Sequence, residues 1–95
     1  MLEPSVQLLF KLCSDHSAVE AIPKRKVDID LMRAKDNLNP EYRVAMSTPH
    51  FLVLRGLSGE DITLRKDGRM IVRNAESEEK ARAAATRILS LLGVR

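Results

Sequence analysis

The sequence predicts an α+β domain, with an antiparallel sheet of four to five strands and with helices at the N- and C-terminal ends of the chain packed on one face. Three observations predict this fold. Segments in which apolar and polar residues alternate follow one another through the middle of the chain, and short turns separate them. Asp67-Gly68 joins two of these segments, and a capped amphipathic helix follows them. Short connections favour antiparallel pairing, and both helices must cover the same sheet face to bury their apolar residues.

The composition indicates one small globular domain. A chain of 95 residues, 44% hydrophobic and 31% charged, can bury one modest core but not two, so residues 1–95 are expected to form a single unit. Its aromatic residues are Phe10, Tyr42 and Phe51, too few for a module that stacks several bases. The net charge of +3 permits an acidic or nucleic-acid partner without requiring one. A single cysteine, Cys13, and the lack of a signal sequence or a transmembrane-length run predict a cytoplasmic protein without membrane contact.

The first quarter of the chain is expected to be helical. Pro4 suits a first helical turn, and the run that follows it through Cys13 has a broad apolar face. This helix should fray near residues 14–17, and a short helical turn over residues 18–21 should end before Pro23.

Alternation with a period of two predicts the first strands. Residues 26–32 carry Val27, Ile29 and Leu31 at alternate positions, which is typical of a half-buried strand. Turn-forming residues 36–40 follow, and then a second alternating segment covers residues 42–47. A third strand is expected over residues 51–55, after a break at Thr48-Pro49.

The last third combines a hairpin with a helix. Asp67-Gly68 favours a tight turn between strands over residues 61–66 and 69–73. The residues expected on the core face of this hairpin are Ile62, Leu64, Met70 and Val72. A helix should begin after Ser77, whose hydroxyl can cap it, and should end at Gly93. Its apolar stripe consists of Ala81, Ala84, Ala85, Ile88, Leu91 and Leu92.

Candidates for catalysis or metal binding are few. His16 and His50 are far apart and match no ligand spacing, so we expect neither a metal nor another cofactor. Asp28 and Asp30 would share a strand face and leave open a small enzyme that uses them as an acid and base pair. Exposed carboxylates are the competing interpretation of that pair. Without a nucleophile or phosphate-loop motif, a non-enzymatic protein is the expectation, with no catalytic residue assigned.

The outward face of the predicted sheet carries the functional hypothesis. Basic and apolar side chains alternate there, and a face used only for solvent contact would seldom hold several large apolar groups. The predicted interaction face consists of Phe51, Val53, Arg55, Thr63, Arg65, Arg69, Ile71 and Arg73. These arginines can bind phosphates or pair with acidic residues such as Asp28 and Asp30, and ion pairs on a solvated face are the competing interpretation.

The segment Ile62–Leu92 resembles the closing unit of one repeat of the TATA-box-binding-protein family. In that family a strand, a Ser-Gly-Lys turn, a second strand, Gly-Ala, a Ser-Glu-Glu cap and a long helix follow in order. The matching residues here are Gly68-Arg69-Met70, Ala75, Ser77-Glu78-Glu79 and Ala84. The resemblance covers about a third of the chain and implies half of that family's fold.

Departures from the family's pattern change the implied function. Arg65 stands where the resemblance places a groove-inserting Phe, Ile71 and Arg73 replace a DNA-facing Val and Thr, and Asn74 replaces a Gly. These replacements argue against kinking DNA with an apolar wedge. The predicted leading helix also lacks the strand that opens the family's repeat, and a two-fold dimer would be needed to rebuild the saddle.

The leading hypothesis is therefore a non-enzymatic domain that docks a protein partner, or a second copy of itself, through its open sheet face. The alternatives are nucleic-acid binding by Arg55, Arg65, Arg69 and Arg73, and a small enzyme that uses Asp28 and Asp30.

Overall fold

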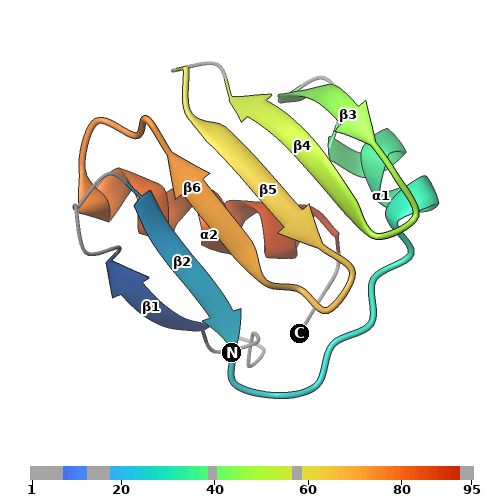
Figure 1. Cartoon of the computed structure of the whole chain (residues 1–95), viewed down its shortest axis with the longest axis horizontal. Coiled ribbons are helices and arrows are strands. Elements are labelled where there is room, and N and C mark those ends of the chain that lie inside the picture. The colour runs from blue at the N-terminus through green and yellow to red at the C-terminus, as the bar shows by residue number, and fades with distance from the viewer. Residues whose placement is uncertain (1–7, 13–17, 39–40, 57–58, 93–95) are drawn as a thin grey trace, which may run out of the picture.

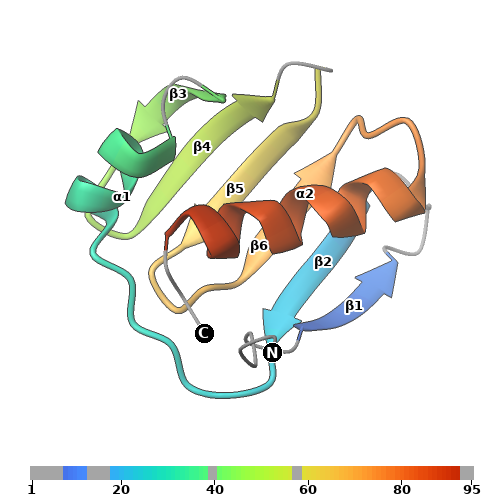
Figure 2. The ribbon, with the colours of Figure 1, turned by 180° about the vertical axis from the view of Figure 1, so that it is seen from behind.

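The computed structural model describes residues 8–12, 18–38, 41–56 and 59–92. Within them the fold is α+β, with a six-stranded antiparallel sheet in the order β1-β2-β6-β5-β4-β3 and with helices α1 and α2 on one face (Figures 1 and 2). The elements are β1 Leu8–Leu12, β2 Ala18–Pro23, α1 Leu31–Leu38, β3 Tyr42–Ser47, β4 Phe51–Gly56, β5 Asp61–Arg65, β6 Met70–Arg73 and α2 Glu78–Leu91.

The chain enters the sheet at one edge and returns to its middle. β1 and β2 form an antiparallel pair, and a loop and α1 then carry the chain to β3 at the opposite edge. From β3 the strands follow one another through β4 and β5 to β6, which pairs with β2 (Figure 1). The pairing of β2 with β6 joins segments about fifty residues apart and completes the sheet.

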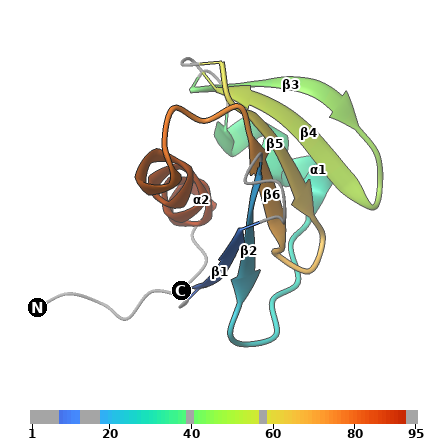
Figure 3. The ribbon, with the colours of Figure 1, turned by 60° about the vertical axis from the view of Figure 1, so that its left-hand side comes forward.

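The inner face of the sheet, which the helices cover, forms the core. Ile62, Leu64 and Met70 are completely buried and Val72 is 1% exposed, as predicted for the core side of the hairpin. Leu52 and Leu54 of β4 are equally buried. The remaining core residues come from β2, β3, the two helices and the loop before α1, and include Val19, Ala21, Ile29, Tyr42, Leu31, Ala34, Leu38, Ala81, Ala85, Ile88 and Leu89. The opposite face has no helix on it in the described part of the chain (Figure 3).

Both helices begin with side-chain caps. The backbone N–H of Lys80 donates to Ser77 Oγ (3.1 Å), so the predicted cap of the last helix is confirmed. Its predicted end at Gly93 lies outside the described residues. The backbone N–H of Met32 donates to Asp30 Oδ1 (3.1 Å) at the start of α1. From α2 the Arg82 guanidinium lies 5.2 Å from the centre of the Phe10 ring, a contact with β1 at the sheet edge.

The prediction for the N-terminal region is wrong in its described part. Residues 8–12 form a strand rather than a helix, and residues 18–21 belong to a second strand rather than to a helical turn. The rest of that expected helix and the fraying region at 14–17 lie outside the described residues. An apolar run of this length does not distinguish a buried strand from a helix by periodicity. β1 pairs with β2, and β2 pairs with β6, so both segments are strands. They raise the number of strands in the described sheet from the predicted four or five to six.

The strand predicted over residues 26–32 is also wrong. The described structure has a loop there, followed by α1, which begins at Leu31. The helix buries Leu31, Ala34 and Leu38, whose spacing of three and four residues is helical. Residues 36–38, which were predicted to belong to a turn, therefore lie in the last turn of α1. Residues 39–40 of that predicted turn lie outside the described chain.

The turn of the predicted hairpin is one residue longer than expected. The N–H of Arg65 donates to the carbonyl of Arg69 (2.8 Å), which leaves a three-residue loop that ends with Gly68 at φ +88°. This loop pairs Leu64 with Met70 and Ile62 with Val72. A two-residue loop would shift the register by one and turn one strand's core residues outward.

Candidate interaction face

The open face is the side of the sheet away from α1 and α2, and it contains all eight residues of the predicted interaction face. Seven of them occupy alternate positions of β4, β5 and β6, and the eighth, Arg69, directly precedes β6. The four apolar or hydroxyl side chains are half-buried and the four arginines are exposed. The backbone therefore brings together residues that are up to 22 positions apart in the sequence.

The middle row holds apolar side chains around the hydroxyl of Thr63. Val53 pairs with Thr63, and Thr63 pairs with Ile71. Met46 continues the row on β3 opposite Val53 and is 53% exposed. Glu20 of β2 closes the other end, opposite Ile71. These side chains lie side by side without a covering element in the described chain.

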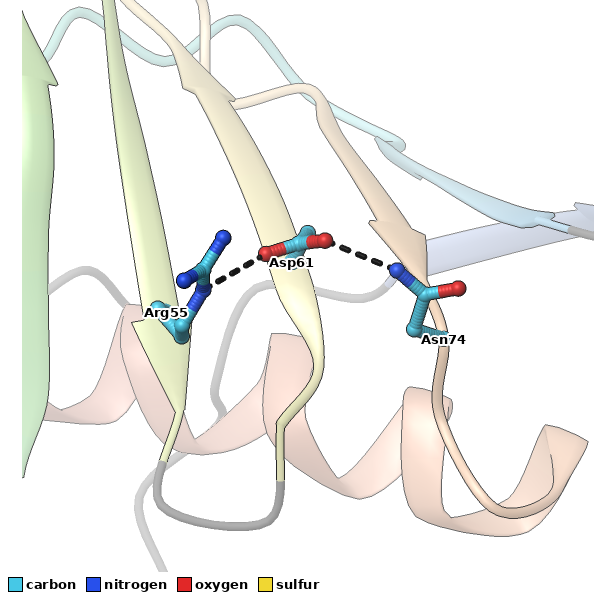
Figure 4. A network of polar contacts seen from close by, with 3 residues as sticks. All are labelled: Arg55, Asp61 and Asn74. Carbon is cyan, nitrogen blue, oxygen red and sulfur yellow. Dashed lines mark hydrogen bonds and ion pairs between the residues drawn. The ribbon is translucent and has the colours of Figure 1, made fainter.

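An arginine row lies beside the loop between β4 and β5. Arg55 pairs with Asp61, and Asp61 pairs with Arg73. Arg55 Nε donates to Asp61 Oδ1 (3.1 Å), and Asn74 Nδ2 donates to Asp61 Oδ2 (2.8 Å), so both carboxylate oxygens are engaged (Figure 4). These hydrogen bonds, that of Arg55 first, lower the pKa of Asp61 below its ordinary value. Arg43 of β3 stands opposite Arg55 and extends the row.

A second basic group lies at the opposite end, beside the hairpin turn. Arg65 pairs with Phe51 across β5 and β4. The Arg65 guanidinium lies 3.2 Å from Asp67, and that of Arg69 lies 4.0 Å from the same carboxylate. Asp67 Oδ1 also accepts the backbone N–H of Arg69 (3.1 Å), which holds the carboxylate in the turn.

The acidic partners of the arginines differ from those predicted. Asp61 and Asp67 pair with them, whereas Asp28 and Asp30 are not on a strand at all. Asp30 caps α1, and Asp28 lies in the loop before it. The prediction that these two carboxylates share a strand face is therefore wrong. The sequence signal that could have found Asp61 is strand alternation, which places it on the same face as Thr63 and Arg65.

The open face is wider than the predicted set because β1, β2 and β3 also contribute. Their outward residues follow from the register and are Leu9, Lys11, Ala18, Glu20, Ile22, Arg43 and Met46. The strands β1 and β2 were predicted as helix, so these outward positions on them were missed. With the adjoining turn of Lys66, Asp67 and Gly68, the described open face has seven basic side chains against three acidic ones, an excess of four positive charges.

Metal-binding groups do not gather in the described ranges. No set of three or more His, Cys, Asp and Glu side chains there is placed to hold a metal ion. His50 is an exposed residue between β3 and β4, and His16 lies outside the described residues. Among the described helices, none has the length and apolar character needed to cross a membrane.

Comparison with protein-family models, with curated proteins and with solved structures finds no significant match for this chain.

Proposed function

We propose that this protein is a non-enzymatic interaction domain that docks a protein partner through the open face. The observation that carries the proposal is the half-buried apolar row of Val53, Thr63 and Ile71, which lies between two groups of arginines on a sheet face without a cover. Protein interfaces commonly have this anatomy, with an apolar centre and a polar rim that is rich in Arg.

The dimensions of the face suit a protein partner. The described molecule extends over 31 × 31 × 24 Å, and its broad dimensions are those of the sheet. A standard interface buries about 800 Å² on each partner, which a surface of this breadth can supply.

The charge of the face favours a partner with an acidic surface. Seven basic and three acidic side chains on and beside the open face leave a positive excess, and two copies placed face to face would bring like charges together. A homodimer through this face is therefore the less favoured form of the proposal, and the oligomeric state tests it.

The resemblance to a TATA-box-binding-protein repeat remains part of the proposal. The predicted leading helix lacked the strand that opens the family's repeat. The chain instead has a strand, β2, and a helix, α1, ahead of the strands β3 to β6, so this departure no longer counts against the resemblance. Arg65, where the resemblance places an apolar wedge, supports docking rather than kinking of DNA.

A cross-linking experiment tests the docking proposal. A photoreactive amino acid at Thr63, in the middle row, should cross-link to a partner in cell extract, while the same group at Thr86 on the exposed side of α2 should not. The partner identified in this way should bind Ile71→Glu at least tenfold more weakly and Thr86→Glu unchanged. Equal cross-linking at the two positions, or no effect of Ile71→Glu on a folded variant, would contradict the proposal. Self-cross-links with sedimentation as a dimer would select the homodimer.

Nucleic-acid binding is the second candidate, and the arginine excess favours it. Its signature is an affinity that falls steeply with salt, with a slope of about −0.9 for each phosphate contact on a duplex. Replacing Arg55, Arg65, Arg69 and Arg73 one at a time by Gln should reduce that slope stepwise in a fluorescence-anisotropy titration. Absence of binding to duplex and single-stranded oligonucleotides at low salt would remove this candidate.

A further inference from the structure

A hollow of about 600 Å³ lies where the hairpin end of the open face meets the loop that leads from β2 to α1. Phe51 of β4 and Thr63 of β5 line it from the sheet, and Val27 lines it from the loop. The described cations around it are Lys26, Arg65 and Lys66. Cavities of about 300–1,000 Å³ that combine apolar lining with a few polar groups are typical of small-molecule sites.

Backbone hydrogen bonds hold the walls of this hollow together. The N–H of Ile29 donates to the carbonyl of Lys66 (2.9 Å), which ties the loop to the hairpin turn. The N–H of Lys66 donates to the carbonyl of His50 (3.2 Å), which ties the same turn to the β3–β4 connection. A Cβ on Gly68 would lie 2.9 Å from Pro23 and 3.3 Å from Val27, so the turn and the loop are in close contact. The hollow is therefore preformed, and a ligand would have little ordering of the protein to offset.

The charges around the hollow favour an anion. Three cationic side chains line it together with the imidazole of His50 and two carboxylates, Asp28 and Asp67. Asp67 contacts Arg65 (3.2 Å) and accepts the N–H of Arg69 (3.1 Å), so Arg65 and Asp67 compensate each other and leave Lys26 and Lys66 against Asp28. The lining has an excess of one positive charge, which a single carboxylate or similar acid would balance.

We propose that this hollow binds a small aromatic monoanion, whose ring contacts Phe51 and Val27 and whose acidic group faces the cationic rim of Lys26, Arg65 and Lys66. The inference goes beyond docking of a protein on the open face, although the two surfaces share Phe51, Thr63 and Arg65. Ring burial supplies affinity, and the charge at the rim discriminates between ligands.

An NMR titration with three matched probes tests the proposal. Indole-3-acetate has the ring and the negative charge, indole-3-acetamide is the neutral analogue, and tryptamine carries a positive charge. The acetate should give saturable shifts at the amides of Phe51, Thr63 and Lys66, and it should bind about tenfold more tightly than the amide. Tryptamine should give the weakest binding. Equal affinities for the three probes, absence of saturable shifts, or shifts spread over the whole sheet would overturn the proposal.

Two sets of variants locate the site. The double change Lys26→Ala and Lys66→Ala should abolish the preference for the acetate, while Lys80→Ala on α2 should leave it unchanged. Ile71→Glu, which does not line the hollow, should weaken docking of a protein partner but leave indole-3-acetate binding in place. Loss of probe binding in Ile71→Glu with the fold intact would contradict a separate site. Failure of the probe titration alone leaves the docking proposal to its own test.

Discussion

The two faces of this sheet are made by the same strands but differ in what covers them. On the inner face Leu52, Leu54, Ile62 and Leu64 are completely buried under the helices. On the open face their immediate neighbours, such as Val53 and Thr63, remain half-buried with no covering element in the described residues. Alternation along the strands gives the sheet apolar side chains on both faces. The position of the helices makes one face the core and leaves the other available for partners.

The largest expected effect comes from truncating the inner face. Leu64→Ala should lower the free energy of unfolding by about 2–5 kcal/mol, because the change removes buried contacts and leaves a cavity. Thr63→Ala, one residue away on the open face, should cost about 1 kcal/mol or less. Chemical denaturation of both variants measures the contrast. Similar losses for the two would mean that the open face is covered in solution.

The turn that sets the register of the two faces gives a smaller effect. Gly68→Ala should cost about 1–2 kcal/mol from the left-handed backbone alone, since φ is +88°, and more from the contact with Pro23. Gly59→Ala is the matched control, because φ is +90° there and nothing lies within 4 Å of the added Cβ. Thermal or denaturant unfolding should rank Gly68→Ala as the more destabilised protein. The reverse order would contradict close packing of the turn on the loop.

The smallest effect is expected from the polar network of the open face, and it depends on pH. Arg55 and Asn74 lower the pKa of Asp61, so the folded state binds its proton less readily than the unfolded state. The stabilisation is complete above the ordinary carboxyl pKa of 3.8 and is lost as the pH falls through the lower folded-state value. Asp61→Asn should flatten the stability profile in that acid range, measured against wild type. An NMR titration that gives Asp61 an ordinary pKa would show that the network is not formed in solution.

Sequence reasoning succeeded where local signals and tertiary contacts agree. The alternation in residues 42–47 and 51–55, the hairpin with Gly68 and the Ser77 cap are properties of a few neighbouring residues, and the structure has each of them. The eight residues of the interaction face were grouped correctly on one side because the period of a strand is two. Their function as a docking surface stays a prediction.

Sequence reasoning failed where distant segments decide the structure. The Leu8–Leu12 segment is a strand because it pairs with β2, which in turn pairs with β6. Nothing within that apolar run distinguishes the two conformations. At residues 27–31 apolar and polar residues alternate, although this segment is not a strand. The helical signal that overlaps it is Asp30, a capping residue, followed by apolar residues at the helical spacing of Leu31, Ala34 and Leu38.

The sequence by itself determined the hairpin, the capped C-terminal helix and the division of the last strands into two faces, because these depend on residues within one turn or one strand of each other. Only the tertiary structure decided that the sheet has six strands in its described part and that α1 and α2 share one side. It also placed Asp61 between Arg55 and Asn74 (Figure 4) and formed the open hollow beside Phe51. These features require contacts between distant segments, which form only when burial of the whole inner face offsets the entropy lost in closing long loops.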